Sequence, residues 1–293
     1  MSTIFLTGGM GNIGKRILTI LAEKHRIIAL GYRKQGIQHP SIEWVTGDIR
    51  RPESYLNYLK KCDVLVHLAA DVSNTSSLLH ETNVRATNEL VLSARQVGCK
   101  KIIIFSSAAV TQDFLTPYSR SKKIMEEELS QMNIPMIVVR PTLVYSKGSN
   151  YLRGMEHYLH LPLPFVPLPN GGNADLRPIH VEDVGKALLR VIEGPVPPKF
   201  CVYDWASRES FTFGQALALI AEKRGITKPL VSIPHALLGE SYLLAQKIGL
   251  RLPLRFIQLA AQGSSYHVNP RSFEQDYHFV FREPDKGFRD CIE

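Results

Sequence analysis

Apolar residues along the chain occur either in short unbroken runs or in longer stretches with a period of about 3.6 residues. Unbroken runs are typical of strands buried on both faces of a parallel sheet, and the longer period is typical of helices with one apolar face. Their regular alternation predicts an α/β fold, a doubly wound parallel sheet with right-handed crossovers. The predicted strands are Ile4–Leu6, Ile27–Leu30, Glu43–Thr46, Val64–His67, Ile102–Phe105, Ile137–Pro141 and Lys199–Asp204.

Helical periodicity fills the intervals between these strands. The longest such stretch, from Thr82 to Gln96, has its apolar residues on one side, and a second starts near Tyr118. Residues 161–172 break the pattern, because prolines alternate there with apolar residues and proline cannot donate to a sheet. We expect an extended loop in this region.

Three glycines follow the first predicted strand and precede the first helix. Gly8 permits a tight turn, Gly11 lacks the Cβ that would block a phosphate, and Gly14 lets the helix approach the strand. A strand, a glycine turn and a helix in this order place a pyrophosphate on a helix N-terminus. The turn predicts a dinucleotide site, with Asn12 and Ile13 beside the glycines.

This site defines a Rossmann-type fold with a small C-terminal substrate-binding lobe. We expect the NAD(P)-binding domain at residues 1–160, with a returning segment around 176–205, and the lobe at 161–175 and 206–293. The second strand is followed by Arg33, not by the acid that holds an NAD ribose, which favours NADP slightly over NAD. Leu68, Ala69 and Ala70, after the fourth strand, let the backbone pass close to the cofactor.

Composition narrows the class of protein further. The 293 residues are 44% hydrophobic, enough for a sizeable core, and a net charge of +8 favours anionic ligands or a basic surface that aids solubility. The four cysteines are widely spaced, which predicts a reducing compartment. No charged segment leads into an apolar one as in a signal peptide, so we expect a cytoplasmic protein. We find no apolar run of membrane-spanning length, no metal-ligand spacing and no nucleic-acid motif, so none of these partners is expected.

Tyr118 and Lys122 are four residues apart and share one face of a predicted helix. A phenol is a poor base at neutral pH, but a nearby ammonium favours its phenolate. Ser107, at the end of the preceding strand, can hold the substrate oxygen while Tyr118 exchanges its proton. The three residues predict a redox centre that interconverts an alcohol and a carbonyl.

Several motifs together resemble the extended short-chain dehydrogenase/reductase family, the NAD-dependent epimerase/dehydratase group. The resemblance implies that Tyr118 is the acid/base, that Lys122 also holds the nicotinamide ribose, and that Ser107 binds the reacting oxygen. It also implies that Asp48, beside Ile49, meets the adenine, and that Arg177 binds a phosphate of a nucleotide-sugar substrate. The motifs are residues 7–14, Gly47-Asp48-Ile49, His67-Leu68-Ala69-Ala70, Asn83, Ser106-Ser107, Tyr118 to Lys122, Arg140-Pro141 and residues 177–183.

The sequence departs from this pattern in ways that bear on the substrate. Ala108 and Ala109 replace the acidic pair of the sugar dehydratases, and only a short loop separates Ser107 from Tyr118. An oxidoreductase or epimerase acting on a nucleotide sugar is the leading interpretation. The alternatives are an NADPH-dependent ketoreductase acting on a non-nucleotide carbonyl compound and a dinucleotide-binding protein without turnover.

Two further expectations concern partners. The resemblance implies a homodimer that pairs through the two long helices, Thr82 to Gln96 and Ser119 to Met132. The stretch from Leu237 to Leu259 combines an apolar side with basic residues. Pro253 interrupts it, which favours a helix of the substrate lobe over a helix lying on a membrane surface.

Overall fold

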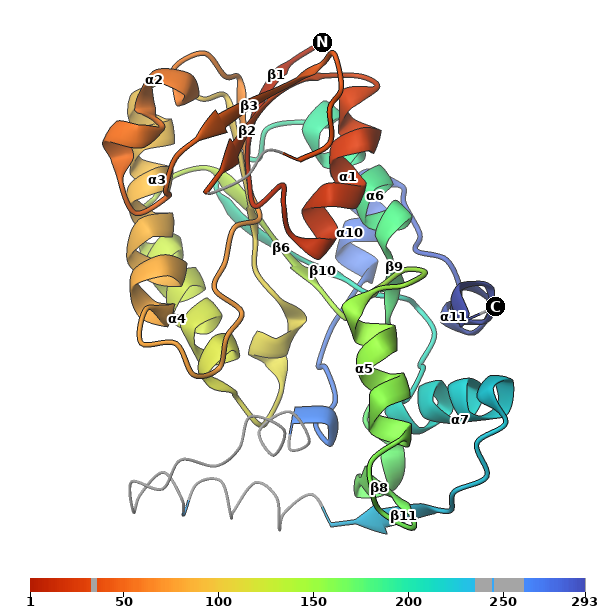
Figure 1. The fold of residues 1–293 in the computed structure, drawn as a ribbon. Helices are drawn as coiled ribbons and strands as arrows, with labels where there is room; N and C mark the ends of the chain where they lie inside the picture. Colours follow the sequence, from red (N-terminus) through yellow and green to blue (C-terminus); the bar gives the residue numbers. More distant parts are fainter. Residues whose placement is uncertain (33–35, 235–243, 245–260, 293) are drawn as a thin grey trace.

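A seven-stranded parallel sheet forms the centre of the computed structural model, which describes residues 1–32, 36–234, 244 and 261–292 (Figure 1). The strand order is β10-β6-β5-β4-β1-β2-β3, and every neighbouring pair is parallel. This order confirms the predicted doubly wound, Rossmann-type sheet. The strands are β1 (Thr3–Thr7), β2 (Arg26–Gly31), β3 (Ile42–Thr46), β4 (Val64–His67), β5 (Lys101–Phe105), β6 (Met136–Pro141) and β10 (Phe200–Trp205).

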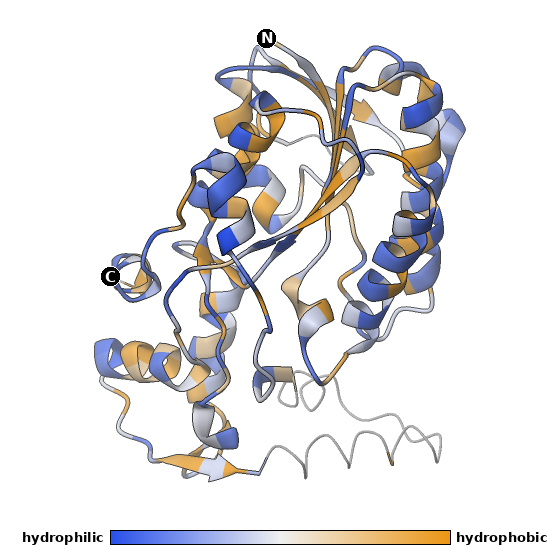
Figure 2. Ribbon diagram, turned by 180° about the vertical axis from the view of Figure 1, so that it is seen from behind, coloured by the Kyte–Doolittle hydropathy of each residue, from blue (hydrophilic) through white to orange (hydrophobic). Residues whose placement is uncertain are grey.

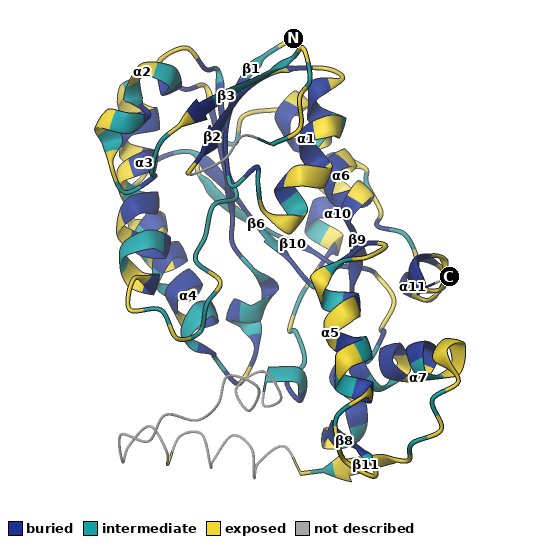
Figure 3. Ribbon diagram, viewed as in Figure 1, coloured by how far each residue is buried: buried dark blue, intermediate teal, exposed yellow. Residues whose placement is uncertain are grey.

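Helices cover both faces of this sheet. Because side chains alternate along a strand, Ile4 and Leu6 of β1 enter one core while Phe5 enters the other. Figure 2 shows apolar strands between helices whose outer sides are polar, and Figure 3 shows the same strands buried. One face packs against α1 (Asn12–Ala22), α6 (Val181–Glu193) and α10 (Arg271–Tyr277), the other against α2 (Leu56–Leu59), α3 (Ala86–Gln96) and α4 (Pro117–Gln131).

A third apolar core forms the smaller lobe. It lies among α5 (Asn150–Leu159), α7 (Phe213–Arg224) and α11 (Pro284–Ile292). α5 belongs to this core, although residues 1–160 were expected to form the first domain; the domain limits stay a prediction. Two short parallel pairs complete the lobe, β7 (Val144–Tyr145) with β9 (Ile179–His180) and β8 (Val166–Pro169) with β11 (Leu230–Ile233).

The expectation of a loop over residues 161–172 was wrong for β8, which includes Pro167 and Pro169. The pair β8–β11 has only two strands, so each proline nitrogen can face away from its single partner.

Two expectations concern residues outside the described ranges. One is that Arg33 favours NADP; the other is the helix expected from Leu237 to Leu259, of which only residue 244 is described. Among the helices that the structure describes, none has the length and apolar content to cross a membrane.

Candidate active site

The glycine turn between β1 and α1 has the geometry of a phosphate cradle. Gly8 has φ +77°, and a Cβ there would lie 2.5 Å from the backbone nitrogen of Ala69. A Cβ on Gly14 would collide with the carbonyl oxygen of Gly8, whereas one on Gly11 would meet only that oxygen, at 3.2 Å. Gly14 therefore serves helix packing, and Gly11 leaves open the space that a phosphate needs.

Two adjoining cavities form one long groove over the carboxyl ends of the strands. The first, about 460 Å³, is lined by Tyr32, Asp48 and Ile49; the second, about 590 Å³, is lined by Gly11, Asn12, Ile13 and Leu68. Gly8, Met10, Ala69 and Ala70 line both cavities. The described residues predicted to bind the cofactor thus lie along a single groove, and its length and glycine cradle fit a dinucleotide.

Asp48 does not face the first cavity as a free carboxylate. The guanidinium of Arg50 donates to both of its oxygens, from Nε at 3.1 Å and from Nη2 at 2.6 Å. These hydrogen bonds hold the pKa of Asp48 below its usual value. Any contact of Asp48 with an adenine would therefore involve an ion pair, a feature that the motif alone did not predict.

Asn83 fixes the loop that both cavities share. It lies in a π-helical turn, Glu81–Arg85, which precedes α3 where the sequence predicted regular helix. Its side-chain amide donates to the carbonyl oxygen of Asp71 and accepts from the Asp71 nitrogen, both at 2.8 Å. Behind the same loop, buried His67 contacts Thr7 at 2.7 Å and Thr87 at 3.0 Å. The groove wall is therefore held by side chains on β1, β4 and two helical segments.

The second cavity also brings together Ser107, Tyr118 and Lys122. Ser107 caps a short 3₁₀ turn, where its Oγ accepts from the Ala109 nitrogen at 3.2 Å. Tyr118 lies in the first turn of α4, which Thr116 caps and Pro117 begins. The three residues thus come from one stretch of chain, the connection from β5 to α4 and the first turns of α4, as their order in the sequence predicts.

Burial raises the pKa of Tyr118 to about 12, while the hydrogen bond from Ser107 acts in the opposite direction. Removal from water is the largest effect on this phenol, and the expectation that Lys122 favours its phenolate stays a prediction. Tyr118 is therefore protonated at neutral pH.

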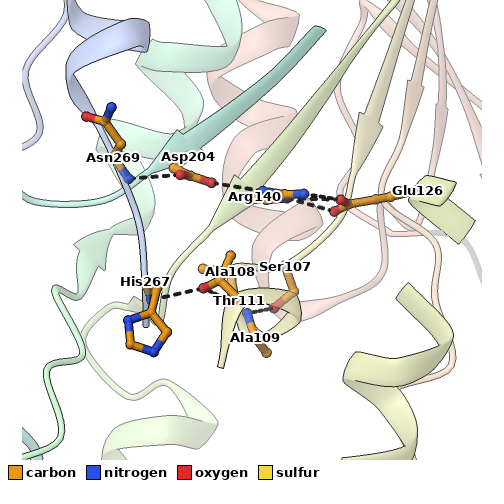
Figure 4. Close-up of polar contacts among 9 residues, drawn as sticks. All are labelled: Ser107, Ala108, Ala109, Thr111, Glu126, Arg140, Asp204, His267 and Asn269. Atoms are coloured by element: carbon orange, nitrogen blue, oxygen red, sulfur yellow. Dashed lines mark hydrogen bonds and ion pairs between the residues drawn. The ribbon is translucent and has the colours of Figure 1, made fainter. Parts of the chain in front are cut away.

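Lys122 is 1% exposed, and its Nζ donates to the carbonyl oxygen of Phe105 at 2.9 Å. Burial lowers its pKa to about 8, and the carboxylate of Glu126 opposes this shift. Glu126 in turn accepts from Arg140, and the Arg140 guanidinium lies 3.7 Å from Asp204 (Figure 4). A partly buried line of charges thus links α4 to β6 and β10.

Residues 261–269 connect the loop after Ser107 to the rest of the lobe. The backbone nitrogen of His267 donates to Thr111 Oγ1 at 3.1 Å, and that hydroxyl donates to Ala108 at 2.7 Å (Figure 4). The side chain of Gln112 donates to the carbonyl oxygen of Ser264 at 2.6 Å. Nothing in the local sequence indicated these contacts, since they join residues about 150 positions apart.

Arg177 lies outside the cavity of Tyr118. Its Nε donates to Asp175 at 2.8 Å and its Nη1 to the Arg208 carbonyl oxygen at 3.1 Å. With Arg208 and Arg271 it lines a separate cavity of about 620 Å³. The structure therefore does not bring the expected phosphate ligand together with Ser107, Tyr118 and Lys122.

Within the described ranges, no three histidine, cysteine or acidic side chains are grouped so that they could hold a metal ion.

The sheet order, the glycine cradle and the Ser107, Tyr118 and Lys122 cluster define a dinucleotide-dependent enzyme of the short-chain dehydrogenase/reductase type. Residues 4–202 match the model of the NAD dependent epimerase/dehydratase family, and the chain belongs to that family.

Named relatives include enzymes of different activities. The chain is 24% identical over 237 residues to a ceramide reductase of Caulobacter vibrioides, covering 79% of this chain and 73% of the relative. It is 25% identical over 276 residues to a dihydroquinoline-oxide ketoreductase of Stigmatella aurantiaca, covering 81% and 79%. The UDP-glucose 4-epimerase of Bifidobacterium longum, solved with NAD⁺ and UDP, shares the fold with a TM-score of 0.74 and 16% identity, covering 99% of this chain and 96% of that one.

Proposed function

We propose that this protein is an NAD(P)-dependent ketoreductase that interconverts a ketone and a secondary alcohol on a substrate without a nucleotide. The observation that carries the proposal is the placement of Ser107, Tyr118 and Lys122 in one cavity that continues into the glycine cradle. A nicotinamide bound in this cavity would supply hydride transfer.

The protein's own residues handle the oxygen and its proton. The hydroxyl of Ser107 donates to the carbonyl oxygen, and Tyr118 gives that oxygen its proton as the alcohol forms. With a pKa of about 12, Tyr118 is protonated at neutral pH, the form that reduction requires. The ammonium of Lys122, on the same helix face, stabilises the phenolate that remains until solvent returns the proton.

The walls of the cavity support a carbonyl substrate without a diphosphate. They include Val72, Val144 and Tyr151, whereas Arg177, the expected phosphate ligand, is bound by Asp175 elsewhere. Reductases among the named relatives support the same choice.

A nucleotide-sugar epimerase is the second candidate. It is supported by the similarity to the fold of UDP-glucose 4-epimerase and by the arginines of the separate cavity, Arg177, Arg208 and Arg271.

The proposals of a homodimer through α3 and α4 and of a cytoplasmic location rest on the sequence alone.

The deciding experiment is to test the purified protein for bound nicotinamide and then to titrate it with NADPH and NADH. Exchangeable binding, followed by NADPH oxidation with apolar ketones, supports the ketoreductase. Tightly held NAD⁺ together with conversion of UDP-sugars supports the epimerase and contradicts the ketoreductase.

Arg33→Ala should weaken NADPH binding far more than NADH binding; equal losses would show that Arg33 does not recognise the 2′-phosphate.

A further inference from the structure

Tyr151 lines the reaction cavity from the side of the lobe. It lies in the first turn of α5, after the capping residue Ser149, and it lines the same cavity as Ser107 and Tyr118. Its hydroxyl oxygen is buried and has no hydrogen-bond partner in the part of the chain that the structure describes. A buried hydroxyl without a partner is costly, and a ligand bound in the cavity that Tyr151 lines would supply the missing partner.

Other tyrosines show that this arrangement is specific to the site. Tyr158, two turns further along α5, donates its hydroxyl to the carbonyl oxygen of Pro167. Tyr55 and Tyr145 also have buried hydroxyls without partners, but they lie in the apolar cores and line neither cavity of the groove. Among the tyrosines that the structure describes, Tyr151 alone lines the reaction cavity and has a buried hydroxyl without a partner.

The surroundings of Tyr151 keep its hydroxyl protonated, so that it can donate a hydrogen bond. Burial raises the pKa of Tyr151 well above the usual value, and the neighbouring phenol of Tyr266 adds to the shift. Both rings pack against the apolar core of the lobe.

We propose that the Tyr151 hydroxyl donates to a second oxygen of the substrate, apart from the carbonyl oxygen held by Ser107 and Tyr118. The substrate class is then a ketone with a nearby hydroxyl or carbonyl oxygen, bound between the sheet edge and the lobe. The proposal rests on the ketoreductase function and deepens it, because it selects among ketones.

Three ketones of equal length test this substrate class: octan-3-one, 1-hydroxyoctan-3-one and 4-hydroxyoctan-3-one. Binding of each is measured by calorimetry with the protein saturated with NADP⁺, so that no turnover is needed. At least one hydroxyketone should bind the wild type about fivefold more tightly than octan-3-one, the effect of one neutral hydrogen bond. Tyr151→Phe should remove this preference, whereas Tyr158→Phe, which removes a hydroxyl already bound to Pro167, should keep it.

Equal binding of all three ketones by the wild type overturns the proposal, and this result does not depend on whether a variant folds. A preference that persists in Tyr151→Phe overturns it as well. NADPH oxidation is measured separately. A preference that depends on Tyr151 without turnover of any ketone would contradict the ketoreductase function while leaving the binding role supported.

Discussion

Arg140 holds the carboxylate of Glu126, its Nε lying 3.0 Å from both oxygens, and Glu126 follows Lys122 by one helical turn. Spacing of four residues places Glu126 and Lys122 on one face of α4, so the carboxylate can offset the charge of the buried ammonium. Arg140 shares that carboxylate and is also within 3.7 Å of Asp204. The charge of Lys122 thus depends on its burial and on Glu126, a residue outside the reaction cavity.

Glu126→Gln should move the alkaline limb of the activity profile to lower pH. Glu126 opposes the effect of burial, so its loss lowers the pKa of Lys122 further below about 8. Activity that needs charged Lys122 then falls earlier as pH rises. The measurement is kcat/KM against pH, with Glu127→Gln, an exposed neighbour, as the control. An unchanged alkaline limb in Glu126→Gln would contradict the role of this carboxylate.

Lys122→Met should alter how stability depends on pH. Burial lowers the pKa of Lys122 to about 8 in the folded protein, against about 10.4 in an unfolded chain. Between these values the unfolded chain binds the extra proton, so the free energy of unfolding gains up to about 1.4 kcal/mol per pH unit as pH rises. Urea unfolding at pH 7.5 and 9.5 should show this contribution in the wild type and in Lys123→Met, an exposed control, but not in Lys122→Met. The same pH dependence in all three proteins would refute it.

Tyr118→Phe should reduce kcat by about 10²- to 10⁴-fold, the usual contribution of an acid/base group, because no other described residue holds its place in the cavity. Affinity for NADPH, measured by fluorescence titration, should stay within about twofold, since the glycine cradle is unaltered. Tyr158→Phe provides the matched loss of a phenol hydroxyl away from the site. Full turnover by Tyr118→Phe would exclude the proposed mechanism.

Features of the site that depend on nearby residues were predictable from the sequence. The glycine turn and the Tyr118 and Lys122 pair follow from spacing within one or two elements, and the structure gathers them in one groove. The pKa of Tyr118 was not predictable in direction, because burial depends on the whole fold. Nor was the position of Arg177, since the partners that hold it, Asp175 and the Arg208 carbonyl, are set by the path of the lobe.

The same dependence on the fold separates two glycines of one motif. Gly11 has φ −69° and ψ 169°, which alanine adopts readily, and its Cβ would meet only the Gly8 oxygen. Gly11→Ala should therefore leave the free energy of unfolding within about 0.5 kcal/mol and weaken NADPH binding at least tenfold, because the methyl group enters the phosphate cradle.

Gly14→Ala, unlike Gly11→Ala, should lower the free energy of unfolding. Its Cβ would collide with the backbone of Gly8 and Gly9 inside the packed turn. Backbone atoms cannot yield as a flexible side chain does, and overpacking of this kind costs about 1–3 kcal/mol of stability. Urea unfolding and NADPH titration of both variants separate the two effects. If Gly11→Ala bound NADPH as the wild type does, the phosphate would not rest on Gly11, and the cradle assigned to the first turn of α1 would be wrong. If Gly14→Ala were as stable as the wild type, the close contact between α1 and the strand would not be needed.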